Sequence, residues 1–89
     1  MTMTDTELLN AVKTALNITG TYQDETLNVY IADVKNFMSD SGVSDDLINS
    51  SVSVGVIARG VSDLWNYGSA KFSDYFIQRV IQLKYKGGE

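Results

Sequence analysis

Residues 50–67, which read SSVSVGVIARGVSDLWNY, decide between an all-helical chain and one that contains a strand. Three valines at every second position from Val52 to Val56 are typical of a strand. The same segment also carries apolar residues at helical spacing, namely Val56, Ile57, Val61, Leu64 and Trp65. A lone strand would expose an unpaired edge, and nothing else in the chain offers it a partner. We therefore expect one helix over about 51–67.

Two glycines lie inside this expected helix. Gly55 and Gly60 each cost a helix about 1 kcal/mol relative to alanine. Their five-residue spacing does not place them on one face of the helix. We interpret each as a position where another segment's backbone comes close.

The residues before this segment predict two longer helices and a short one. Thr4 and Glu7 have the spacing of a capping box, which begins a helix over about 5–17. A second helix is expected over about 23–39, with Tyr22 packed against Leu27 or Thr26. Gly20 is the expected left-handed residue of the first break, and Gly42 ends the second helix. Ser44 would cap a short helix over about 45–49.

The residues after it predict one more helix, over about 74–85, with Ser73 as its cap. The fold class expected for the chain is therefore all-α: a small bundle of four main helices plus one short helix. No linker divides the chain, so residues 1–89 form one domain, with a flexible C-terminal tail from about 86.

Composition excludes most catalytic chemistry. The 89 residues include no Cys and no His, which removes disulfides, thiol nucleophiles, imidazole bases and zinc sites built from nitrogen and sulfur ligands. The acidic pairs at 24–25 and 45–46 are adjacent, so on a helix they point about 100° apart and share no site. We expect no enzyme, no metal and no cofactor. No apolar run reaches the roughly 18 residues of a membrane span, and the N-terminus lacks signal-peptide features.

Charge is distributed unevenly along the chain. Residues 1–46 carry eight acidic residues against two lysines, a balance of −6, whereas residues 69–89 carry four basic residues against two acidic ones, a balance of +2. This acidic front and basic tail arise by chance in a short chain or serve head-to-tail association between copies. No basic stripe is present, which disfavours nucleic-acid binding as the main task.

Aromatic residues gather near the C-terminus. Six of the nine lie between 65 and 85, and a core this small cannot easily use them all. Some serve as core or as half-exposed rings. The alternative is a protein-binding surface, because tyrosine and tryptophan are frequent interface anchors; its members would be Tyr67, Phe72, Tyr75 and Tyr85. The third interpretation of these aromatic residues is a platform that stacks nucleobases. It is disfavoured because few basic residues lie among them.

The order of these features resembles the tailed-phage head-tail connector family, the small head-completion or adaptor proteins encoded next to capsid genes. The resemblance spans nearly the whole chain, and its motifs are caps and apolar patterns. They are Thr-Asp-x-Glu-Leu-Leu at 4–9, a glycine break, Tyr30-Ile31, Leu64-Trp65-Asn66-Tyr67-Gly68, and Phe76-Ile77-x-x-Val80-Ile81-x-Leu83-Lys84. The resemblance implies an all-helical subunit that assembles into a ring beneath the portal, extends the DNA channel and offers the tail a docking surface. It brings no catalytic residues.

On this reading the partners are other copies of the chain, the portal protein and the tail or stopper proteins. DNA would pass through the ring without specific binding, and no membrane is involved. Copies would associate side to side, with basic residues of one facing acidic residues of the next: Arg79, Lys84 and Lys86 against Asp24, Glu25 or Asp33. Residues 85–89 would form the docking arm.

The expected location is the head-tail junction of the virion, and the host cytoplasm during assembly. Such connectors can stay monomeric in isolation, because association must overcome the loss of rigid-body entropy. Two rival functions remain: a small helical module that binds DNA or terminase, and a generic regulatory or toxin–antitoxin interaction domain. A portal or capsid gene beside this one would favour the connector.

Overall fold

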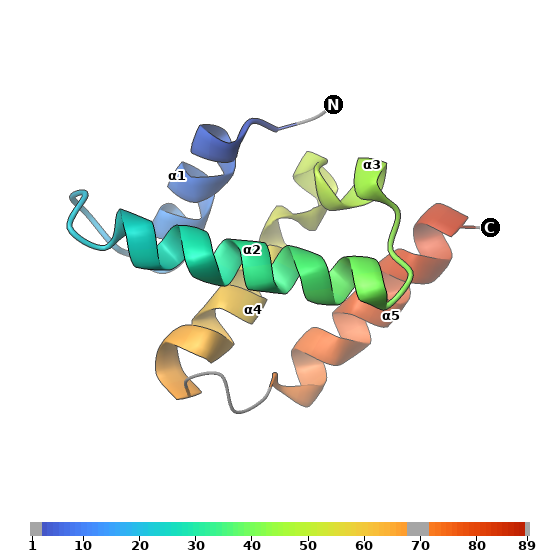
Figure 1. Cartoon of the computed structure of the whole chain (residues 1–89). Helices are drawn as coiled ribbons and strands as arrows, with labels where there is room; N and C mark the ends of the chain where they lie inside the picture. Colours follow the sequence, from blue (N-terminus) through green and yellow to red (C-terminus); the bar gives the residue numbers. More distant parts are fainter. Residues whose placement is uncertain (1–2, 68–71, 89) are drawn as a thin grey trace.

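The computed structural model describes residues 3–67 and 72–88, and within them it contains helices and no strand (Figure 1). The helices are α1 (Asp5–Ala15), α2 (Asp24–Asp40), the short α3 (Asp45–Ile48), α4 (Val54–Tyr67) and α5 (Asp74–Gly88), with a single 3₁₀ turn η1 (Ser51–Ser53) before α4. The expected all-α fold with four main helices and one short one is therefore confirmed.

The segment that decides the fold is helical, and its serines explain why it imitates a strand. Ser50 lies before η1, where its hydroxyl accepts a hydrogen bond from the Val52 amide at 3.3 Å. Ser53 is buried and donates to the Leu47 carbonyl oxygen at 2.6 Å. These two serines of the segment thus serve turn and cap geometry. The expected helix over 51–67 is correct from Val54 onward, and its first turn is 3₁₀.

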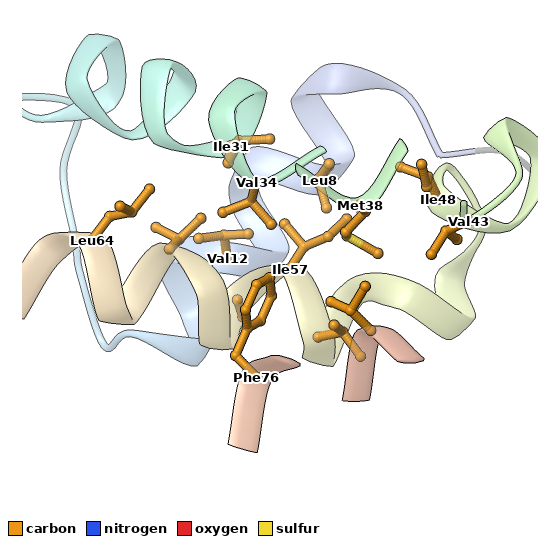
Figure 2. Packing of buried hydrophobic residues seen from close by; sticks show 14 of the residues in the cluster. Leu8, Val12, Ile31, Val34, Met38, Val43, Ile48, Ile57, Leu64 and Phe76 are labelled. Carbon is orange, nitrogen blue, oxygen red and sulfur yellow. The ribbon is translucent and has the colours of Figure 1, made fainter. Parts of the chain in front are cut away.

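Helix α4 forms the centre of the bundle, because it packs against α1, α2 and α5 (Figure 1). Its apolar residues meet those of the surrounding helices in one continuous cluster, in which the labelled side chains point toward one another (Figure 2). The buried members are Leu8, Val12, Leu27, Ile31, Val34, Met38, Val43, Ile48, Val56, Ile57, Ala58, Val61, Leu64, Phe76, Val80 and Leu83. This core fixes which faces of α2, α4 and α5 remain outside.

The predicted caps and breaks are confirmed. Both hydrogen bonds of the Thr4–Glu7 capping box are present, at 2.9 and 3.1 Å. The Ser44 hydroxyl accepts from the Leu47 amide, and the Ser73 hydroxyl accepts from the Phe76 amide. Gly20 and Gly42 both have positive φ, at 79° and 104°.

Besides the start of α4, two helix ends differ from the expected ones by more than one residue. Helix α1 ends at Ala15 rather than 17, because Asn17 takes a left-handed conformation with φ of 60°. The following amide, of Ile18, donates to the Lys13 carbonyl at 2.8 Å and closes the helix end. Helix α5 continues to Gly88, three residues beyond the expected end at 85.

Two interpretations of single residues are wrong. Tyr22 is 96% exposed, so it does not pack against Leu27 or Thr26; Leu27 instead points into the core. At neither glycine of α4 does the backbone of another segment come close. Gly55 has open space where a Cβ would stand, whereas at Gly60 a Cβ would meet side chains, with Phe76 Cε1 at 2.7 Å and Val34 Cγ2 at 2.9 Å.

Candidate partner-binding surfaces

Two arginines and a tyrosine lie together on α4 and α5, and we name Arg59, Tyr75 and Arg79 the Arg–Tyr–Arg cluster. Arg59 and Tyr75 are exposed, and Arg79 is half-buried. The guanidinium carbons of Arg59 and Arg79 lie 5.1 and 5.8 Å from the centre of the Tyr75 ring. Arg79 also donates a hydrogen bond from Nη1 to the Tyr75 hydroxyl at 2.9 Å. The ring, half exposed, therefore holds two cationic groups close together at the surface, an arrangement suited to carboxylates.

A buried carboxylate, that of Asp63, lies beside Arg59 of the cluster. Asp63 is 2% exposed, and its Oδ2 accepts a hydrogen bond from the Ser73 amide at 2.9 Å. Its Oδ1 lies 3.4 Å from Nε of Arg59, one helical turn earlier in α4. Asp63 thus ties the beginning of α5 to α4 and orients Arg59. The sequence interpretation missed both residues, although their i, i+4 spacing was visible.

A second surface lies on the outer face of α2. Glu25, Val29 and Asp33 recur every four residues and are all exposed; we name them the acidic stripe. They lie opposite the buried side of the helix, which carries Leu27 and Ile31. Among the described residues no basic group pairs with Glu25 or Asp33. Val29, 56% exposed, was not predicted as a site residue.

Asp24 differs from its neighbour Glu25. Its Oδ1 lies 2.7 Å from Nζ of Lys13, and the same ammonium donates to the Gly20 carbonyl oxygen. Lys13 is mostly buried and so fixes the loop between α1 and α2. The predicted acids Asp24, Glu25 and Asp33 therefore do not form one surface: Asp24 already has a partner within the chain.

The other predicted site residues lie at the end of α4, in the segment before α5 and in the last turns of α5. The aliphatic stem of Lys84 lies beside Gly42, with Cε 3.1 Å from where a Cβ would stand, and its ammonium lies 5.8 Å from the centre of the exposed Tyr85 ring. Phe72 is half-buried, with its ring 4.9 Å from that of Phe37 and 4.6 Å from that of Phe76. The side chains of Tyr67 and Lys86 lie outside what the structure describes, as does Glu89 of the expected docking arm.

The described residues also form a groove on another side of α2. An open groove of about 350 Å³ between α1 and α2 is lined by Asp5, Leu8, Asn28, Ile31, Ala32 and Lys35. Its charged groups are an ion pair, with Lys35 Nζ 3.9 Å from the exposed carboxylate of Asp5. Within residues 3–67 and 72–88, no three acidic side chains are placed to hold a metal ion. No described helix is both long enough and apolar enough to cross a membrane.

Comparison with known proteins gives one family. The family model described as "Phage gp6-like head-tail connector protein" matches residues 6–83, which include all of α2, α3 and α4 and most of α1 and α5. No curated protein and no solved structure gives a significant match. The match covers both surfaces defined above.

Proposed function

Because the chain belongs to the phage gp6-like head-tail connector family, we propose that it is a subunit of a ring between the portal and the tail of the virion. The ring would sit beneath the portal, extend its channel and give the tail or stopper proteins a docking surface. The role is structural, as the family is one of connector proteins and not a known enzyme family.

The observation that carries this proposal is family membership over almost the whole chain. Two features of the fold support it. A ring of identical copies needs two different complementary surfaces on each subunit, and this chain carries the acidic stripe and the Arg–Tyr–Arg cluster on different elements. A compact helical body with a single core is also suited to serve as a repeated building block.

A DNA channel also suits the charge of the chain. The net charge is −4. A wall of this sign repels phosphate groups, so DNA would move past it without being held. The DNA- or terminase-binding alternative requires tight binding that survives moderate salt, which a surface of this sign does not favour.

The proposal is tested by mixing the purified chain with the portal protein of the same virus and sedimenting the mixture. We expect several copies of the chain to sediment with each portal assembly. A chain that stays with the slowly sedimenting material at every concentration would contradict the proposal. A short DNA duplex in place of the portal serves as the comparison, and binding to it should disappear at moderate salt.

A further inference from the structure

We propose that the acidic stripe of one copy docks on the Arg–Tyr–Arg cluster of the next copy. This inference rests on the proposed function, since it identifies the contact between neighbouring subunits of that ring. The occupant of each surface is thus a second copy of this chain.

The two surfaces match in the order of their chemistry. The acidic stripe presents a carboxylate, an apolar side chain and a second carboxylate at Glu25, Val29 and Asp33. The cluster presents two guanidinium groups beside a half-exposed aromatic ring at Tyr75. Val29 can lie on the ring while each carboxylate meets an arginine, which leaves no charge against an apolar group.

The spacing of the charged groups is compatible with the contact. Glu25 and Asp33 are eight residues apart, which is about 12 Å along a helix axis. The two guanidinium carbons lie 5.1 and 5.8 Å from the same ring centre, so they are separated by no more than these two distances together. The glutamate and arginine side chains are long enough to take up the remaining difference.

The contact joins different copies and does not close within one chain. The acidic stripe lies on the side of α2 that turns away from the core, whereas Arg59 and Tyr75 belong to α4 and α5 on the other side of that core. A contact between two different surfaces repeats from copy to copy and closes into a ring when the rotation permits. One helix face on one cluster is a small interface, so isolated copies would associate weakly until a template aligns them.

The structure changes which residues form the contact that was predicted from sequence. Asp24 is already paired with Lys13, and the stem of Lys84 covers the Gly42 turn. Both residues therefore leave the contact, whereas Val29, Arg59 and Tyr75 enter it. Arg59 keeps its ion pair with Asp63, so among the described residues Arg79 supplies the principal free charge. Asp63 contributes indirectly, because its carboxylate orients Arg59.

Cysteine trapping tests the contact, and the chain suits it because it has no cysteine of its own. One copy carries Val29→Cys and the other Gln78→Cys, an exposed position one turn after Tyr75 on α5, so that the Tyr75 ring and both arginines are kept. The two copies are mixed at high protein concentration and low salt under mild oxidation. We expect a disulfide-linked heterodimer. Ile81→Cys replaces Gln78→Cys in the control, since Ile81 is also exposed on α5 but lies one turn further from Tyr75. This control should give at least about tenfold less heterodimer.

Charge reversal then tests the pairing in the same assay. Glu25→Lys with Asp33→Lys in the first copy, or Arg79→Glu in the second, should each lower the heterodimer yield at least about tenfold, because like charges then face each other. Reversal in both copies together should restore part of the yield, because one introduced lysine then meets the introduced glutamate while the other still faces Arg59. Arg59 is not substituted in these variants, because a glutamate at position 59 would lie beside the buried carboxylate of Asp63. Lys84→Glu makes the same charge change as Arg79→Glu outside the contact and should leave the yield unchanged.

Four results would overturn the inference: equal trapping through Ile81→Cys, a yield indifferent to charge reversal, no recovery when both copies are reversed, or a predominance of Val29→Cys homodimers. Loss of DNA binding in the Arg79→Glu variant with unchanged trapping would also overturn it and assign the cluster to DNA. A chain that joins the portal but gives no heterodimer refutes this contact alone. Trapping without portal binding refutes the connector role and leaves the contact standing.

Discussion

At Gly60, helix α4 lies so close to Phe76 and Val34 that no side chain fits. A Cβ at this position would lie 2.7 and 2.9 Å from two atoms of the Phe76 ring and 2.9 Å from Val34 Cγ2. Both neighbouring side chains are fully buried, so neither can move aside into solvent. The glycine therefore exists for packing, and its cost in helix propensity is offset by the close approach of α2 and α5.

We predict that Gly60→Ala destabilises the protein and Gly55→Ala stabilises it. Overpacking of a core costs about 1–3 kcal/mol, against a propensity gain of about 1 kcal/mol. Gly55 has open space around it, so the same substitution there brings only the propensity gain, at most about 1 kcal/mol. Urea denaturation of both variants measures the two shifts. Midpoints that move in the same direction would contradict this account of α4.

At the scale of the elements, the join between α4 and α5 depends on one buried carboxylate. Asp63 accepts the hydrogen bond of the Ser73 amide and lies beside Arg59. We predict that Asp63→Ala lowers the free energy of unfolding by about 1–3 kcal/mol, because it removes the acceptor of a partly buried backbone amide. Asp63→Asn keeps an acceptor oxygen and should lose less, since the ion pair with the half-exposed Arg59 contributes little. Equal losses in chemical denaturation would show that the hydrogen bond to Ser73 is unimportant.

The presence of each helix could be predicted from the sequence, because each capping hydrogen bond joins residues within one helical turn. The box at Thr4 and Glu7 and the serine caps at 44 and 73 are formed as expected. The predictions that proved wrong, those for Tyr22 and Gly60, depended on tertiary contacts. The local spacing around Tyr22 suggests packing on α2, yet Leu27 is used by the core and leaves the tyrosine exposed. The close partners of Gly60 are likewise 26 residues before it, at Val34, and 16 after it, at Phe76.

At the scale of the whole molecule, the sequence could predict opposite charges but not the surfaces that carry them. Residues 1–46 are acidic overall, and Glu25 and Asp33 do share an outer face. Asp24 could not be separated from them, because its partner Lys13 lies across a loop. Arg59 and Tyr75 meet only through the packing of α4 on α5, which no local spacing reveals. The family resemblance, in contrast, rested on the whole order of caps and apolar stripes and is confirmed.

The central claim is that copies of this chain join one another around the portal axis. Electron microscopy of portal assemblies incubated with the purified chain tests it most directly. We predict an added layer of density at the tail-facing end of the portal that forms a closed annulus around the open channel. Portals that stay bare, or that carry single copies scattered over other surfaces, would contradict the claim.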